Sequence, residues 1–225
     1  VSGLHFQPCA TIHFSNIVTI YASVFYDITK KQREDMNKKI AADVYTQTAS
    51  DGYILRPATM EEVPAIWEII LQAKAQMYRE GKHQWDENYP TVPILENDVR
   101  RGWGYVLVPD NCSTQPEPDI IAYGAVVFDG EPAYDGLRDG KWLSGQPYVV
   151  LHRLAVADSW KRQGMAVRYM QAVCDLAISR GIRSFKVDTN YDNFYMQRVF
   201  SRLGFTYCGR IRYEAGERMA YEKML

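Results

Sequence analysis

A strand, a glycine-containing turn and a helix follow one another between residues 148 and 181, and this succession constrains the fold more than any other part of the sequence. Residues 148–156 form an apolar run that is typical of a strand, and Gly164 lies in the turn after them. Apolar residues at helical spacing then predict a helix from Ala166 to Arg180, which Gly181 ends. Because the first N–H groups of a helix have no partners within it and lie at the positive end of its dipole, such a turn can hold a phosphate group.

Basic residues gather at this turn. Lys161, Arg162 and Arg168 supply positive charge, and no acidic residue lies between Ser159 and Gln171. An ordinary helix start with basic residues on the surface is the alternative interpretation. The turn matches neither the G-x-G-x-x-G pattern of dinucleotide-binding proteins nor the P-loop pattern of NTPases, which argues against both classes.

The composition is that of an ordinary globular protein. The 225 residues suit one domain, and 47% hydrophobic with 24% charged residues exclude disordered and coiled-coil classes. Since 26 Lys and Arg residues stand against 27 Asp and Glu residues, the net charge of -1 predicts neither a nucleic-acid nor a membrane partner. The 4 cysteines form no C-x-x-C pair and no Cys/His pair, so we expect no metal site and a reducing, cytoplasmic location.

Residues 1–52 are interpreted as an N-terminal extension. The apolar stretch at residues 12–28 is interrupted by polar residues and too short for a membrane span, and the positive charges follow it, which is the wrong order for a secretory signal. The chain begins with Val1, and Met36 precedes the first readable pattern. Residues 1–35 are therefore either a spurious or dispensable upstream extension, or a genuine strand or helix packed on the body.

From residue 53 on, the hydrophobic pattern predicts strands and helices in one continuous domain. Thr59 and Glu62 match the capping-box pattern at a helix start. The glycine- and proline-rich residues 129–147 are interpreted as a long connection rather than core. Strands are predicted at residues 53–57, 105–108, 120–128, 148–156, 206–213 and 218–224, the last two forming a hairpin across residues 214–217, and helices at residues 60–78, 93–101 and 166–180.

Residues 151–156, followed by residues 162–166, resemble the acetyl-coenzyme A signature Q/R-x-x-G-x-G/A of the GNAT superfamily of N-acetyltransferases. Residues 187–189, Asn193, Met196 and residues 203–205 are similar to the second half of the same motif set. The resemblance covers residues 53–225, which we expect to form the N-acetyltransferase domain. It implies an α+β fold with a mixed, mostly antiparallel central sheet of about six to seven strands, flanked by about four helices.

Two positions depart from the pattern of that superfamily. Lys161 replaces the usual Gln or Arg, which is a modest change because the main chain carries most of the phosphate contacts. Phe200 stands where many members have a tyrosine acid, and it cannot donate a proton.

The resemblance implies acetyl-CoA as co-substrate and indicates where it binds. The strand before the turn splays from its neighbour, and the main chain of Leu154, Ala155 and Val156 pairs with the pantetheine arm. Asn193 contacts the same arm. Leu154 and Val156 are also good core residues, and Asn193 is a good helix N-cap, so structural roles are the alternatives. The pyrophosphate is expected on the N–H groups of Arg162, Gln163, Gly164, Met165, Ala166 and Val167.

Amide formation by direct attack requires a neutral amine and therefore a base. His152 is the candidate, because it lies two residues before Leu154 and histidine ordinarily titrates near neutral pH. The alternative is a half-buried strand residue bonded to a neighbour. Acidic and aromatic residues between the first two helices suit a cationic acceptor, although a solvated loop is the alternative. These acceptor candidates are His83, Trp85, Asp86, Glu87 and Tyr89.

The predicted function is acetyl-CoA-dependent transfer of an acetyl group to a primary amine, more readily a small molecule than a protein. We expect an enzyme without a metal, acting as a monomer or homodimer. A non-catalytic acyl-CoA-binding or regulatory module is the alternative, and Phe200 favours it.

Overall fold

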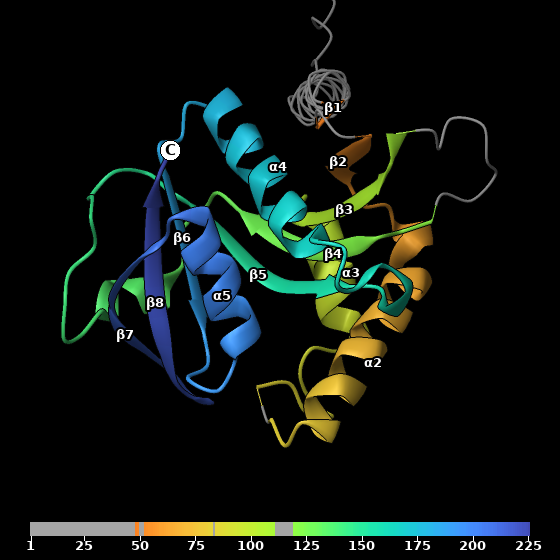
Figure 1. Cartoon of the computed structure of the whole chain (residues 1–225), viewed down its shortest axis with the longest axis horizontal. Coiled ribbons are helices and arrows are strands. Elements are labelled where there is room, and N and C mark those ends of the chain that lie inside the picture. The colour runs from red at the N-terminus through yellow and green to blue at the C-terminus, as the bar shows by residue number, and fades with distance from the viewer. Residues whose placement is uncertain (1–47, 50–51, 83, 111–118) are drawn as a thin grey trace, which may run out of the picture. The chain divides into compact units, whose positions relative to one another are not determined.

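The computed structural model describes residues 48–49, 52–82, 84–110 and 119–225 of the chain (Figure 1). Residues 1–35 and His83 lie outside these ranges, so the interpretation of the N-terminal extension stays a prediction. In the part of the chain that is described, no helix is long and apolar enough to cross a membrane.

One mixed sheet carries the fold, with the strand order β1-β2-β3-β4-β5-β6-β8-β7. Neighbouring strands pair antiparallel except β5 and β6, which are parallel. The strands are β1 (Thr48–Ala49), β2 (Tyr53–Pro57), β3 (Gly104–Pro109), β4 (Ala122–Val127), β5 (Val149–Val156), β6 (Ser184–Thr189), β7 (Thr206–Tyr213) and β8 (Gly216–Met224). The predicted α+β class is confirmed, and the two-residue β1 accounts for the eighth strand.

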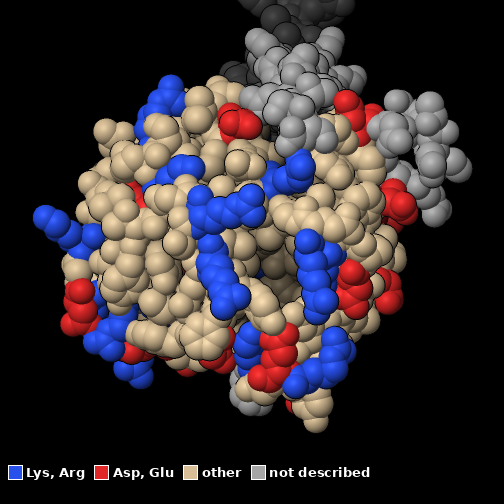
Figure 2. All heavy atoms as spheres, in the orientation of Figure 1, with Lys and Arg blue, Asp and Glu red and all other residues tan. Residues whose placement is uncertain are grey.

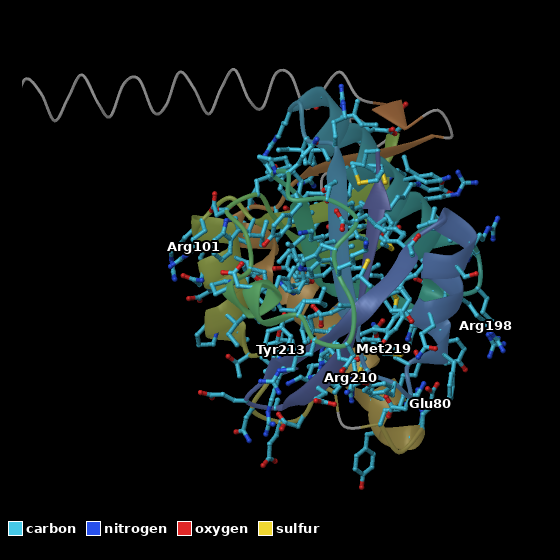
Figure 3. All side chains as sticks on the ribbon, turned by 90° about the vertical axis from the view of Figure 1, so that its left-hand side faces the viewer. Glu80, Arg101, Arg198, Arg210, Tyr213 and Met219 are labelled. Atoms are coloured by element: carbon cyan, nitrogen blue, oxygen red, sulfur yellow. The ribbon has the colours of Figure 1, made fainter. Side chains whose placement is uncertain are left out.

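The helices form two layers around the sheet (Figure 1). In the described ranges there are four α-helices: α2 (Val63–Arg79), α3 (Val92–Arg100), α4 (Met165–Ser179) and α5 (Phe194–Leu203). Helices α4 and α5 cover one face of the sheet, and α2 and α3 cover the other. Arg101 beside α3 and Arg198 on α5 therefore point away from the sheet on opposite sides (Figure 3). Short 3-10 turns occur at η1 (Met60–Glu62), η3 (Pro132–Gly136) and η4 (Asp158–Trp160).

Local signals explain how α2 begins and which face it buries. The Thr59 N–H donates to the Glu62 carboxylate at 2.9 Å, so the predicted capping box is present. Ile66 and Ile70, four residues apart on one stripe, are fully buried against the sheet.

Tyr169 fixes α4 on the sheet. Its hydroxyl lies 3.0 and 3.1 Å from the main-chain oxygens of Tyr105 and Gly124. A Cβ atom at Gly124 would lie only 2.8 Å from the Leu151 side chain and 2.9 Å from the Tyr169 hydroxyl, so only glycine permits this close approach. The helix start that follows β5 is therefore held in place from inside the core.

The interpretation of residues 129–147 as a connection without core is wrong. Tyr134 of η3 is 1% exposed and packs with Val127 of β4 and Val150 of β5. The sequence signal failed because aromatic residues in this segment follow neither a helical nor a strand period. The segment covers the part of the sheet face that α2 and α3 leave open.

Glu222 of β8 anchors the far end of this segment. Its carboxylate is fully buried and accepts hydrogen bonds from the N–H groups of Leu143 at 2.5 Å and Ser144 at 3.3 Å. The hydroxyls of Ser144 and Ser184 donate at 2.9 and 2.7 Å. Four donors compensate the cost of burying this carboxylate.

The C-terminal hairpin is present but tighter than predicted. Tyr213 pairs with Gly216, so only Glu214 and Ala215 lie outside the strands. A two-residue connection is the commonest hairpin geometry.

Candidate active site

The parallel strands β5 and β6 separate soon after they meet. Their pairing consists of Val149 with Phe185 and Val150 with Lys186, and beyond these pairs β5 is paired with β4 alone. The β4–β5 register slips between Tyr123 and Ala125, where β5 contains one extra residue. A bulge of this kind bends a strand, and here it opens a cleft between β5 and β6.

The cleft has a volume of about 640 Å³ and passes between the diverging strands. Leu151, Leu154 and Val187 belong to the core beneath α4 and α5, whereas the alternating residues His152 and Asp188 bond to η3 on the other face. Figure 2 shows a hollow on the α4/α5 face, bordered by Lys and Arg side chains on both sides. Six of the predicted site residues line the cleft: Trp85, Asp86, Tyr89, His152, Leu154 and Asn193.

The turn before α4 has the geometry of an anion cradle. Arg162 and Gly164 have φ values of 63° and 79°, and the first backbone hydrogen bond of α4 runs from the Arg168 N–H to the Gly164 carbonyl at 3.1 Å. Among the described residues, no well-formed main-chain hydrogen bond is found for the N–H groups from Arg162 to Val167. These are the residues that the sequence predicts for the pyrophosphate, and the open space around Gly164 suits a close ligand.

His152 is bonded to a carboxylate that the sequence analysis missed. Its Nε2 atom lies 3.0 Å from Oε2 of Glu131, and both side chains are mostly buried. Oε1 of Glu131 accepts the Ala133 N–H at 3.1 Å and thereby caps η3. Burial raises the pKa of Glu131, but the hydrogen bonds from His152 and Ala133 outweigh it, so this pKa is lowered overall.

Asp188 of β6 is held in a similar way. Its Oδ1 atom accepts the hydroxyls of Tyr134 at 2.8 Å and Tyr213 at 3.2 Å. Burial, reinforced by the charge of Asp188, raises the pKa of both tyrosines, so both phenols stay protonated donors. The η3 turn therefore contacts β5 through Glu131 and β6 through Tyr134.

Arg153 occupies the bulge with a φ of 56°. Its guanidinium donates to both oxygens of the buried Asp98 at 2.8 and 2.9 Å, and to the Tyr89 hydroxyl at 3.0 Å. The Asp98 carboxylate neutralises the charge of Arg153 in this bidentate pair. The hydrogen bonds of Arg153 also connect α3 and the loop before it to β5.

The predicted acceptor residues that the structure describes divide into three groups. Asp86 and Tyr89 line the cleft and close a tight turn through the Asp86 N–H and the Tyr89 carbonyl, 3.0 Å apart. Trp85 also lines it, but its side chain is 7% exposed and packs in the core of α2 and α3. Glu87 lies at the corner of the turn, is exposed and is not among the cleft residues, and His83 is outside the described residues.

Asn193 lines the cleft as the N-cap of α5, since its side-chain oxygen accepts the Met196 N–H at 3.3 Å. The alternative role for this residue is thus observed. Leu154 and Val156 likewise pack against the core. Phe200 is 2% exposed and faces the same cleft among other aromatic rings, so this position offers no proton donor.

The comparisons with known proteins agree with this geometry. A model of the acetyltransferase (GNAT) family matches residues 67–205, which is more than half of the chain. The chain belongs to the GNAT acetyltransferase family. This confirms the predicted family, and it supports acyl-CoA-dependent acetyl transfer by an enzyme over the non-catalytic module. The acceptor, the location and the oligomeric state stay predictions.

Solved structures show the same fold. A GNAT-family acetyltransferase from Streptococcus agalactiae is 29% identical, with a TM-score of 0.69 over 78% of this chain and 96% of that one. A ribosomal-protein-alanine N-acetyltransferase from Brucella melitensis is 18% identical, with a TM-score of 0.52 over 76% and 99%. A ribosomal-protein alpha-N-acetyltransferase in complex with coenzyme A is 18% identical, with a TM-score of 0.54 over 79% and 97%. Comparison with curated protein sequences finds no match.

In this GNAT acetyltransferase, two contacts of the cleft could not be predicted from sequence patterns. Glu131 precedes Pro132, a local hint of a cap, but nothing local indicates its contact with a strand residue 21 positions later. The pair of phenols on Asp188 also depends on tertiary structure. No group of three or more metal-binding side chains occurs in the described part of the chain.

Proposed function

We propose that this protein transfers the acetyl group of acetyl-CoA to a small primary amine by direct attack, with His152 as the base. The observation that supports this most is the position of the His152–Glu131 pair in the cleft, two residues beyond the last β5–β6 pair.

The separation of β5 from β6 supports the proposed position of the cofactor. The edge of β5 that β6 leaves unpaired, at Leu154 to Val156, offers main-chain groups to the pantetheine amides. The N–H groups of residues 162–167 offer donors to the pyrophosphate. The two stretches lie on the same strand-turn-helix unit, so one extended ligand can bind both.

The acceptor side carries more negative than positive charge. Four carboxylates and two guanidinium groups line the cleft, and Asp98 matches the charge of Arg153. The carboxylates are Asp86, Glu131, Asp188 and Glu214. This excess, with the aromatic rings of Tyr89 and Tyr213, favours an ammonium group over an anionic acceptor.

The reaction needs one proton to leave the amine. As the amine nitrogen attacks the thioester carbonyl, His152 takes that proton, and the amide forms when the C–S bond breaks. The thiolate of coenzyme A then takes a proton from water, because Phe200 supplies none.

A thiol-release assay over an acceptor panel tests the proposal. The panel contains small monoamines and diamines, their carboxylate analogues and short peptides with a free N-terminus. We expect cationic small amines to be turned over best, and His152→Ala to lower kcat by ~10² to 10⁴ and remove the acid limb of the pH profile. Preference for peptides would contradict the acceptor class, and near-normal turnover of His152→Ala from about pH 6 to about pH 9 would exclude this base.

A further inference from the structure

His152 lacks a strand partner on the side where the reaction is placed. The β5–β6 pairing ends at Val150, so β6 does not fix the strand at His152. Its side chain is fixed instead by Glu131, with Nε2 and Oε2 3.0 Å apart and side-chain exposures of 16% and 19%. Because both groups are mostly removed from water, their interaction is less screened than that of a surface pair.

Glu131 is itself held rigidly. Its Oε1 atom accepts the Ala133 N–H, and its own N–H donates to the Tyr148 hydroxyl at 3.2 Å. The turn that carries it is anchored by Tyr134, whose carbonyl accepts the Trp142 indole N–H at 3.0 Å. The carboxylate therefore meets the imidazole in one defined orientation, without reorganisation during a reaction.

We propose that Glu131 is the positioning residue for His152, an inference that rests on the proposed function. By accepting the Nε2 proton it fixes the tautomer in which Nδ1 carries the lone pair for the acceptor amine. Its negative charge stabilises the imidazolium that forms when His152 takes the amine proton.

Other charged groups surround this pair and do not replace Glu131. Arg153 is adjacent on β5, but its guanidinium is bound by Asp98. Asp188 on β6 is bonded by two phenols, Tyr134 of η3 and Tyr213 of β7. In the described part of the chain, Glu131 is the carboxylate within ion-pair distance of the imidazole.

A purely structural role is the competing explanation, since Glu131 also caps η3. Glu131→Gln separates the two roles, because an amide oxygen can still accept the Ala133 N–H while the charge is lost. Asp135→Asn is the matched control: it removes the same charge from the same turn, at an exposed position outside the cleft.

The test combines kinetics with an NMR titration of the His152 ring protons, assigned with His152→Asn. In Glu131→Gln we expect kcat to fall about 10-fold or more, because the imidazole loses the carboxylate that orients it and stabilises its charged form. The acid limb of the kcat/KM profile and the NMR titration midpoint should both move to lower pH by about half a pH unit or more. Asp135→Asn should leave kcat, the acid limb of the kcat/KM profile and the NMR titration midpoint unchanged.

Unchanged profiles and an unchanged NMR midpoint in a folded Glu131→Gln protein would overturn the inference. A loss of activity accompanied by a lower melting temperature and an unmoved midpoint would also overturn it, in favour of the capping role. If the midpoint moves as expected but no amine is acetylated by the wild-type protein, the coupling of the two residues stands and the proposed function fails.

Discussion

His152 and Asp188 occupy matching positions on two parallel strands, each two residues beyond the last pair that joins those strands. Continued pairing would place them opposite each other. Instead, each is bonded to the η3 turn, His152 through Glu131 and Asp188 through Tyr134. The turn thus bridges the splayed strands on the face of the sheet opposite α4 and α5 while leaving the cleft between them open.

Gly164 tests the cofactor half of the cleft. Its φ of 79° strains any other residue by about 1–2 kcal/mol, and the space around it is open. Gly164→Glu and Gly164→Gln share that strain, but only Glu brings a negative charge to the predicted pyrophosphate position. We expect calorimetry to show weaker acetyl-CoA binding for both variants and a Kd about 10-fold higher or more for Glu than for Gln. Equal affinities of the two folded variants would move the pyrophosphate away from this turn.

Asp86 and Glu87 test the acceptor half, because the structure separates two neighbours that the sequence analysis grouped together. Asp86 lines the cleft and Glu87 does not. Asp86→Asn should raise KM for a cationic acceptor severalfold, less at high salt, since Asp86 is exposed. Glu87→Gln, the matched control, should leave that KM unchanged. Steady-state kinetics at two salt concentrations measures KM for both variants, and KM for acetyl-CoA should stay constant throughout. A larger rise in the acceptor KM from Glu87→Gln than from Asp86→Asn would mean that the turn binds its ligand on the outside.

The His152–Glu131 pair should also make stability depend on pH. Because the pKa of Glu131 is lowered in the folded protein, the folded state binds fewer protons than the unfolded state, so the contribution to stability is present above the unfolded pKa. It is lost as the pH falls through the lowered pKa. Denaturant unfolding across the acid range should show the wild type losing more stability on acidification than Glu131→Gln. Parallel curves for the two proteins would show that this carboxyl titrates equally in both states.

Glu222 should be important for stability far from the cleft. Glu222→Gln turns one acceptor oxygen into an amide donor that faces the buried donors of Leu143, Ser144 and Ser184. We expect a loss of about 2–4 kcal/mol of unfolding free energy by denaturant titration. Glu217→Gln on the same strand is the control, because its half-exposed pair with Arg210 is worth about 0–1 kcal/mol. Similar losses in the two variants would contradict the role of the Glu222 anchor.

Sequence reasoning succeeded where a signal was local or periodic. Four such features are each determined by a few adjacent residues: the apolar stripe of α2, the cap at Thr59, the turn at Gly164 and the N-cap Asn193. These features were sufficient to predict the order of the elements and the turn before α4, while the binding of the cofactor at that turn stays a prediction.

It failed where a role depends on tertiary contacts. The core position of Tyr134 follows no period, and the bond between Glu131 and His152 joins segments with no shared pattern. Trp85, predicted from its chemistry to bind the acceptor, lines the cleft but is also buried in the core of α2 and α3, a role that its chemistry alone does not indicate. Composition can thus indicate what a loop contains, while the surrounding fold decides which side chains remain available.

The strand order has a consequence for how the protein is made. Strand β8 is the last strand in the sequence, but it lies between β6 and β7, so neither of these can complete its pairing until β8 has left the ribosome. Glu222, which anchors the segment that carries Glu131, emerges with it. A nascent chain that has already formed the turn before α4 therefore still lacks the Glu222 anchor, and the segment that carries Glu131 is fully held only when β8 inserts into the sheet.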